Sequence, residues 1–152
     1  MVADRTPVAI LGATGMVGQR FAQLLDNHPW FEVVALVASE RSANKTYAAA
    51  TNWVLETEMP AWARDMTLLG PDDPLPCRWV FSALPGGVAG PVETHLAQAG
   101  HIVCSNASAH RMDPFVPLLI PEVNPDHLDL LLAQRRHHGW EGALITAPNC
   151  TT

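Results

Sequence analysis

The sequence has few charges, few cysteines and no long apolar run, and each shortage argues against a class of protein. Charged residues make up 16% of the 152 residues, and nine Lys and Arg against fifteen Asp and Glu leave a net charge of −6 at pH 7. A protein that binds nucleic acid normally carries a basic face, so this balance disfavours a nucleic-acid partner. No apolar run approaches the ~18 residues of a membrane-spanning helix. The amino-terminal residues do not have the pattern of a signal peptide, so we expect a cytoplasmic protein without a membrane partner.

The cysteines and histidines give no metal or disulfide pattern. Cys77, Cys104 and Cys150 lie far apart, and an odd number without paired spacing does not form a disulfide framework. No CxxC motif suggests zinc, and we expect Cys77 and Cys104 to be small buried side chains. His137 and His138 are adjacent near an expected helix end, where interaction with the helix dipole is commoner than metal binding. We therefore predict no metal site.

Apolar residues make up 48% of the sequence, which is enough to build the core of one domain. Short apolar runs alternate with helical spacing along the chain. The expected strands are residues 7–11, 31–38, 79–84, 101–105 and 143–146, with weaker ones at 66–69 and 117–120. The expected helices are residues 16–27, 88–99 and 124–138, and residues 39–76 are otherwise expected to be irregular. This alternation indicates an α/β fold with a doubly wound, mostly parallel sheet.

The spacing of apolar residues also predicts which face of each helix is buried. Asn124 and Pro125 form a typical helix start, and Gly139 provides the stop for the same helix. The predicted buried faces are Val17, Phe21, Leu24 and Leu25 in the first helix, Val88, Val92, Leu96 and Ala99 in the second, and Leu128, Leu131 and Leu132 in the third.

Three glycines, Gly12, Gly15 and Gly18, form a GxxGxxG pattern between the first expected strand and the first helix. Glycine permits a tight turn and lets backbone N–H groups approach a pyrophosphate at a helix N-terminus. Ligands of parallel sheets bind at the carboxyl ends of the strands, which is where this motif lies. The pattern favours a dinucleotide site, and a purely structural glycine turn is the alternative.

The end of the second strand bears on the choice of dinucleotide. An NAD site usually has Asp or Glu there to bind the ribose hydroxyls, whereas this sequence has Ser39 followed by Glu40, Arg41 and Ser42. Hydroxyl groups and a guanidinium suit a 2′-phosphate, because guanidinium binds phosphate through two hydrogen bonds. The loop therefore favours NADP. The alternative to a cofactor site is a solvated polar loop. NAD also remains possible as the cofactor, because Glu40 is an acidic residue in the same loop.

Cys150 follows the last expected strand, in the run Ala147 to Thr152 with the sequence APNCTT. A cysteine in this position is activated where it opens a helix, because the helix N-terminus favours the thiolate. Taken alone, a single cysteine is equally consistent with a small buried apolar side chain.

Together these segments resemble the aspartate-β-semialdehyde dehydrogenases, in particular their archaeal and fungal-like branch. The resemblance covers nearly the whole chain in order and is weakest between residues 46 and 78. The matching stretches are GATGMVGQRF (12–21), ALVASERSANK (35–45), VFSALP (80–85), SNASAHRM (105–112), PLLIPEVNPDHL (117–128) and PNCTT (148–152).

The resemblance implies a Rossmann-type fold and NADPH-dependent reduction of L-aspartyl 4-phosphate to L-aspartate 4-semialdehyde and phosphate. This reaction feeds lysine, methionine and threonine synthesis. Cys150 would be the nucleophile that forms a thioacyl-enzyme, and Asn149 would help to position it. Residues 1–152 would be the NADP-binding domain, with the substrate and dimerisation domain absent from the sequence. A homo-oligomer, or association with that missing half, is expected.

The remaining roles carry over residue by residue. Arg111 and Asn106 would bind the phosphate of the substrate. The cofactor residues would be Gly12, Thr14, Gly15, Met16 and Val17 at the pyrophosphate, Ser39, Arg41 and Ser42 at the 2′-phosphate, and Ser82, Ala83 and Leu84 along the cofactor.

Some residues depart from the family pattern, and other readings stay open. Asn44 and Ala48 replace residues that are commonly glycine, and Ala147 replaces a common Asn. His110 is expected to be a surface loop histidine without a catalytic role. A non-catalytic NADP-binding module is an alternative, as is the same half of a malonyl-coenzyme A reductase or an N-acetyl-glutamyl-phosphate reductase.

Overall fold

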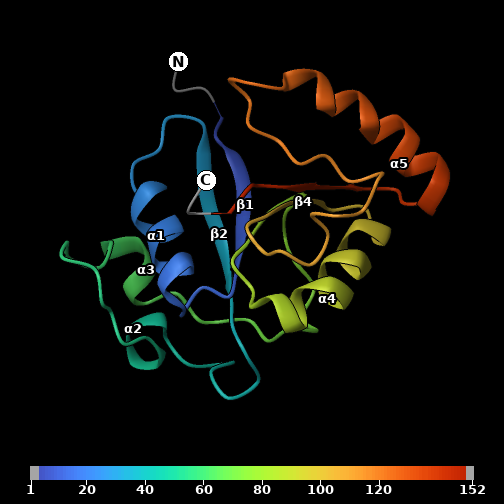
Figure 1. Ribbon diagram of the computed structural model, residues 1–152. Coiled ribbons are helices and arrows are strands. Elements are labelled where there is room, and N and C mark those ends of the chain that lie inside the picture. The colour runs from blue at the N-terminus through green and yellow to red at the C-terminus, as the bar shows by residue number, and fades with distance from the viewer. Residues whose placement is uncertain (1–3, 150–152) are drawn as a thin grey trace. The chain divides into compact units, whose positions relative to one another are not determined.

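The chain folds into two compact units, of which the first ends at Ala83 and the second begins at Leu84. The computed structural model describes residues 4–149 (Figure 1). In the first unit the elements are β1 (Thr6–Leu11), α1 (Met16–Leu24), β2 (Phe31–Val37), α2 (Tyr47–Ala50), α3 (Ala61–Arg64) and β3 (Trp79–Ser82). In the second unit they are α4 (Gly86–Gln98), β4 (Ile102–Ser105), the 3₁₀ helix η1 (Pro125–Asp129), α5 (Leu130–His138) and β5 (Ala143–Thr146).

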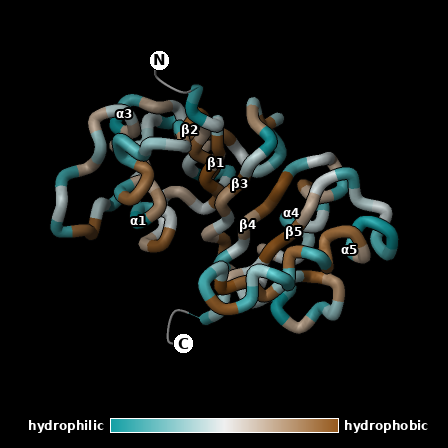
Figure 2. The backbone as a smooth tube through the Cα atoms, turned by 90° about the horizontal axis from the view of Figure 1, so that it is seen from above, coloured by the Kyte–Doolittle hydropathy of each residue, from teal (hydrophilic) through white to brown (hydrophobic). Residues whose placement is uncertain are grey.

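In the first unit β1 lies between β2 and β3 and pairs with both in parallel. Its last four residues are buried, as expected for a short apolar run covered on both faces. The hydropathy colouring shows this β1 run as hydrophobic (Figure 2). The pairing with β2 shifts by one residue between Val8 and Ala9, so that Ala9 faces Ala35. The three strands predicted in this part of the sequence are confirmed within two residues at their ends.

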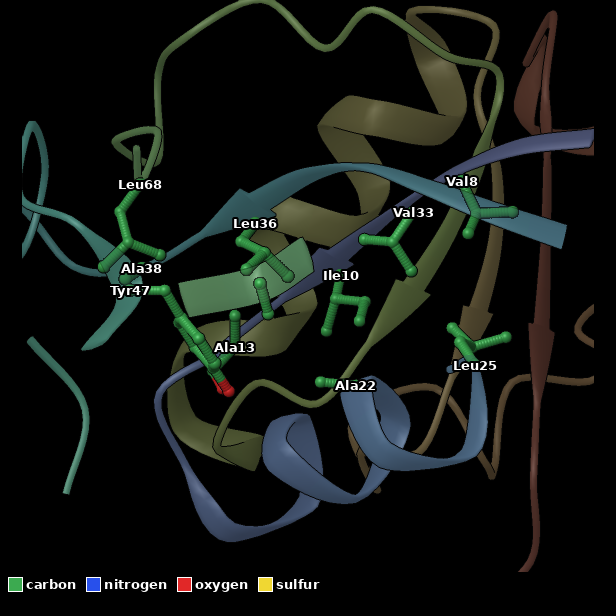
Figure 3. Packing of buried hydrophobic residues seen from close by; sticks show 11 residues of the cluster. Val8, Ile10, Ala13, Ala22, Leu25, Val33, Leu36, Ala38, Tyr47 and Leu68 are labelled. Atoms are coloured by element: carbon green, nitrogen blue, oxygen red, sulfur yellow. The ribbon is translucent and has the colours of Figure 1, made fainter. Parts of the chain in front are cut away.

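Helix α1 lies against the sheet of the first unit with a face that matches the predicted one only in part. Leu25 is buried and Phe21 packs against the core, as predicted. Val17 is 42% exposed and Leu24 is 63% exposed, so their assignment to the buried face is wrong. The helix buries Gly18, Gln19 and Ala22, and Leu25 follows directly after it. Figure 3 shows Ala22 and Leu25 pointing toward Ile10 and Val33 of the strands. Small residues face the sheet because the glycine turn brings the start of the helix close to it.

Residues 39–76 contain more regular structure than predicted. The short helices α2 and α3 were not expected, because four residues are too few to show helical periodicity. The strand predicted at 66–69 is reduced to two isolated bridges, which pair Thr67 with Thr46 and Leu69 with Val37. These bridges and the fully buried Tyr47 attach the segment to the core of the first unit.

The second unit is built on β4 and β5, which pair in parallel from Ile102 opposite Ala143 to Ser105 opposite Thr146. Both predicted strands are confirmed. The short strand expected at 117–120 is a single parallel bridge between Leu118 and Thr146. Helix α4 packs on both strands with a face that was not predicted. Val88 is exposed, and the buried residues are instead Ala89, Glu93 and Ala97.

The last helical segment begins differently from the prediction. Asn124 holds the N-cap position and Pro125 the first helical position, as predicted. The Asn124 side chain, however, makes no capping hydrogen bond, because its Oδ1 accepts a hydrogen bond from Ile120 N at 2.7 Å. A 3₁₀ turn precedes α5, whose one buried residue is Gln134, while Leu132 is 65% exposed and Leu128 is also exposed. The apolar face assigned to this helix is therefore wrong. Gly139 ends α5 as predicted, with a φ of 69° in the left-handed region.

Candidate functional site

The turn between β1 and α1 needs glycine at two of its three glycine positions. Gly12 has a φ of 69°, a conformation that residues with a side chain rarely adopt. A Cβ on Gly18 would lie 2.3 Å from the carbonyl oxygen of Gly12, so only glycine allows α1 to approach the turn this closely. Gly15 donates its N–H to Gly12 O at 3.1 Å and precedes the first residue of α1. The predicted glycine turn is confirmed as a structural feature.

Two buried side chains fix the carbonyl groups of this turn. Tyr47 Oη donates to Ala13 O at 2.8 Å, and Gln19 Nε2 donates to Thr14 O at 2.9 Å. Figure 3 shows the Tyr47 hydroxyl directed at Ala13. Ala13 also donates its own N–H to Val37 O at 3.0 Å. Because these hydrogen bonds come from other residues of the first unit, the conformation of the turn is set before any ligand binds.

The N-terminus of α1 has the features of an anion site. No side chain caps it and its first turn contains no acidic residue. The first N–H groups of a helix have no partner within the helix, and the positive end of the helix dipole lies there. Met16 is 69% exposed and Val17 is also exposed, so solvent reaches this end of the helix. These groups fit the pyrophosphate of a dinucleotide.

Gln19, which the sequence pattern did not predict, also connects the glycine turn to a distant loop. Its Nε2 donates to Asn52 O at 3.0 Å, and its Oε1 accepts from Val54 N at 2.9 Å. The side chain is almost fully buried. A polar residue in a helix is normally assigned to the exposed face, so no local signal in the sequence identifies this role.

Ser39, Arg41 and Ser42 lie in one tight turn after β2. Ser39 O accepts hydrogen bonds from Ser42 N at 2.8 Å and from Ala43 N at 3.1 Å. Within residues 4–149 none of the three side chains has a hydrogen-bond or ion-pair partner. They are therefore available to a ligand, as a 2′-phosphate site requires.

Asn44 has a φ of 64° in the same turn. This explains its place at a position where the family commonly has glycine. Asparagine tolerates the left-handed conformation better than most residues, so the turn keeps its shape without glycine. Lys45 Nζ donates to Arg41 O at 2.7 Å and braces the same turn from its other end.

Ser82 lies at the carboxyl end of β3, where a ligand of a parallel sheet is expected. Its Oγ is buried and has no hydrogen-bond partner among the described residues. Buried hydroxyl groups normally have a partner, so this atom can accept or donate one hydrogen bond to a bound molecule. Ala83 donates its N–H to Leu11 O at 2.9 Å, and Leu84 is half-buried at the start of the second unit.

In the second unit the segment after β4 brings Arg111 and Asn106 together. Arg111 Nη2 donates to Asn106 O at 2.9 Å, and Arg111 Nε donates to Ala147 O at 3.0 Å. The guanidinium thus connects this segment to the chain that follows β5, where Asn149 is exposed. Nη1 has no hydrogen-bond partner among the described residues, which leaves its donors for an anion. Cys150 lies outside the described residues.

Comparison with known proteins decides the family. The family described as semialdehyde dehydrogenase, NAD binding domain, matches residues 7–131. The chain belongs to this family. An aspartate-semialdehyde dehydrogenase of Archaeoglobus fulgidus is 50% identical over 150 residues, which are 97% of this chain and 43% of that protein. The one from Methanothermobacter thermautotrophicus is 54% identical over 147 residues, which are 95% of this chain and 42% of that protein.

A solved structure of the same family has the same fold. The crystal structure of aspartate semialdehyde dehydrogenase with NADP from Candida albicans matches with a TM-score of 0.88 and 38% identity, covering 97% of this chain and 44% of that one. The predicted resemblance and the Rossmann-type fold class are confirmed. The chain spans about two fifths of the length of the curated relatives it matches. Within residues 4–149 no helix is long and apolar enough to cross a membrane.

This member of the semialdehyde dehydrogenase family has two cysteines in its described part. Cys77 is buried as expected, and Cys104 on β4 is half-buried. Burial raises the pKa of both thiols to about 11. Because the thiolate is the nucleophile, neither residue is suited to covalent catalysis.

We expect Cys77 and Cys104 to resist thiol reagents in the folded chain. A pKa raised by about two units leaves roughly 100-fold less thiolate near neutral pH. The measurement is the labelling rate of a Cys150→Ser variant, which retains only these two thiols, in buffer and in urea. Equal rates in the two conditions would show that burial does not protect them.

His110 is not the surface loop histidine that the sequence suggested. Its side chain is only 14% exposed, because the segment after β4 folds back on α4. One ring nitrogen, Nε2, lies 3.2 Å from Gly90 O and 3.9 Å from Glu93 Oε2. The buried Glu93 was also missed, since a glutamate in an amphipathic helix is normally assigned to solvent.

His137 and His138 lie at the C-terminal end of α5, as predicted. His137 stacks on Phe115 with ring centroids 3.9 Å apart, and His138 stacks on Trp140 at 4.2 Å. His138 Nε2 lies 3.5 Å from Asp113 Oδ2. These contacts are packing interactions of the second unit. Among the residues that the structure describes, no group of three or more possible ligands could hold a metal ion.

Proposed function

We propose that this chain is the NADPH-binding part of an enzyme that reduces L-aspartyl 4-phosphate to L-aspartate 4-semialdehyde and phosphate. The observation that carries the proposal is the uncapped N-terminus of α1, held against a glycine turn whose carbonyl groups are already bound by Tyr47 and Gln19. The names of the archaeal relatives support the reaction, and NADP in the Candida albicans protein supports the cofactor.

The residues of the first unit fit a dinucleotide. The N–H groups at the start of α1 would hold the pyrophosphate, with Gly12, Thr14, Gly15, Met16 and Val17 around it. Arg41 would pair with the 2′-phosphate, assisted by the hydroxyl groups of Ser39 and Ser42. Ser82 Oγ would donate to the cofactor and so gain the hydrogen bond that it lacks among the described residues. When bound, the nicotinamide supplies the hydride.

The residues of the second unit suit a phosphorylated substrate. Arg111 would bind the phosphate through Nη1, while its Nε and Nη2 remain on Ala147 O and Asn106 O. Asn106 would contact the same phosphate. A guanidinium held in this way is a fixed, permanently charged donor, so little order is lost on binding.

Cys150 would attack the acyl carbon of aspartyl phosphate. A carbon–sulfur bond forms, the carbon–oxygen bond to phosphate breaks, and phosphate leaves with the electron pair. Asn149, the preceding residue, would position the thiolate. Splitting the reduction into thioester formation and hydride transfer replaces one difficult step with two easier ones. Arg111 would also stabilise the negative charge of the leaving phosphate.

The test is a fluorescence titration of the chain with NADPH and, separately, with NADH. We expect saturable binding, with NADPH bound at least about tenfold more tightly, because the 2′-phosphate adds a charge-assisted pair. Arg41→Ala should weaken NADPH binding by about tenfold and leave NADH binding unchanged. Arg64→Ala removes another exposed positive charge of the first unit and is the matched control, with no effect expected. A preference for NADH would refute the assignment of the 39–42 loop.

A further inference from the structure

Glu93 is a buried carboxyl group that the proposed reaction does not use. Its side chain in α4 is 0% exposed. Oε1 accepts a hydrogen bond from Ser105 Oγ at 2.6 Å. Oε2 has no hydrogen-bond partner among the described residues, and His110 Nε2 lies 3.9 Å from it. Burying a carboxyl group with so few partners costs free energy, so a leucine at this helix position would give a more stable fold.

The contact with Ser105 sets the direction of a single proton. Ser105 Oγ accepts a hydrogen bond from Ala107 N at 3.0 Å, which closes a turn at the end of β4. A hydroxyl group has one proton to donate, and here that proton points to Glu93. Glu93 therefore orients the hydroxyl lone pair toward Ala107 and stabilises the turn that begins the segment 105–111.

The same segment follows α4 along its length. A ring nitrogen of His110 lies 3.2 Å from Gly90 O, and a Cβ on Gly86 would lie 3.1 Å from Ser108 Oγ. The contact at Gly86 is tight, whereas a Cβ on Gly90 would lie at an ordinary van der Waals distance of 3.7 Å from Ala109 Cβ. Its far end is held by the hydrogen bond from Arg111 to Ala147 O. Glu93 is thus the buried polar attachment between α4 and a segment that is otherwise held through backbone groups.

We propose that Glu93 is a positioning residue for an oxyanion site. Through the Ser105 hydroxyl it fixes the segment 105–111 in the conformation in which Asn106 and Arg111 bind phosphate. Glu93 itself contacts neither the substrate nor the reacting atoms. The ligand class rests on the proposed function, in which this segment binds the phosphate of the substrate.

The experiment compares four variants of the chain. Glu93→Leu removes the acceptor at similar volume, and Ser105→Ala removes the hydroxyl group. Glu93→Gln keeps a carbonyl oxygen that can accept from Ser105. Gln134→Leu is the matched control, because Gln134 is equally buried in the second unit and hydrogen-bonds Phe115 and Leu144, away from the segment.

Two NMR measurements are made on each variant. The first is the hydrogen-exchange rate of Ala107 N–H and Arg111 Nε–H without ligand. We expect both to exchange about tenfold faster in Glu93→Leu and Ser105→Ala, because the turn opens more often. The second is a titration with inorganic phosphate, for which the same two variants should bind about tenfold more weakly. Glu93→Gln should stay within about threefold of the wild type in both measurements.

The two measurements test separately the positioning role of Glu93 and the phosphate site of the proposed function. Unchanged exchange in Glu93→Leu overturns the positioning role, whatever the phosphate titration gives. The same holds if Glu93→Gln fails to rescue exchange, or if Gln134→Leu accelerates exchange as much as Glu93→Leu. If exchange responds as expected but the wild-type chain does not bind phosphate, Glu93 positions the segment and the phosphate site of the proposed function is wrong.

Discussion

Gly18→Ala is expected to abolish NADPH binding and to lower the melting temperature by roughly 10 °C. The added Cβ would lie 2.3 Å from Gly12 O and 2.7 Å from Ala13 Cα. Both are backbone atoms of a turn that Tyr47 holds from inside, so α1 must move away from the turn. Such overpacking costs about 3 kcal/mol, and it displaces the helix N-terminus from the site of the pyrophosphate.

Gly87→Ala is the matched control for this substitution. A Cβ at Gly87 meets nothing within 4 Å, and the residue lies inside α4. Alanine is favoured over glycine in a helix by up to about 1 kcal/mol, so the variant should melt at the same temperature or higher. Its NADPH affinity should not change. A Gly18→Ala protein with the melting temperature and NADPH affinity of the wild type would contradict the role of the close approach.

The chain is expected to lose stability steeply between pH 9 and pH 12 because of three acidic groups whose pKa values burial raises, those of Tyr47, Cys77 and Cys104. Burial raises the pKa of Tyr47 from 10.0 to about 12 and that of each thiol from 9.0 to about 11. As the pH rises, the unfolded chain ionises first and is favoured. The stabilising contribution is complete below the unfolded pKa values and is lost through the folded ones. A shift of two units corresponds to up to about 3 kcal/mol for each group.

Tyr47→Phe separates the stabilising hydrogen bond of the hydroxyl group from its contribution to the alkaline transition. At neutral pH the variant should lose about 1 kcal/mol of stability, because Ala13 O loses its hydrogen-bond donor. At alkaline pH it should lose less stability than the wild type, because one of the three raised pKa values is gone. Urea unfolding at a series of pH values measures both. A variant whose stability falls with pH as steeply as that of the wild type would show that Tyr47 does not contribute to the alkaline transition.

The strands and the glycine turn were predictable because local physics determines them. Each of the five strands contains a short, mostly apolar run, and β1, whose last four residues are all buried, is the clearest case. The GxxGxxG spacing between a strand and a helix indicates the turn, and the structure shows why glycine occurs there: Gly12 has a left-handed φ and Gly18 has no room for a Cβ. Together these features were sufficient to predict the fold class and to place the candidate dinucleotide site.

The buried faces of the helices were only partly predictable from apolar spacing, which placed Phe21 and Leu25 correctly but missed the polar residues. Each of the three long helices buries a polar residue against its own unit: Gln19 in α1, Glu93 in α4 and Gln134 in α5. The hydrogen-bond partners of these residues lie outside their own helices, as Val54 does for Gln19. No local sequence pattern therefore predicts that these residues are buried. Gln134 hydrogen-bonds both N and O of Leu144, in the way that a neighbouring strand would. Apolar periodicity assigns such residues to solvent because it contains no information about partners from other segments.

These buried polar side chains also limit how parts of the chain can be exchanged with its relatives. A chimera that received the loop containing Asn52 and Val54 from another family member would need a helix residue that serves that loop as Gln19 does. A graft of the segment 105–111 would need the matching residue of α4 in the same way. In this fold each of these loops and the helix residue that holds it form one transferable module, although the two are separated in the sequence.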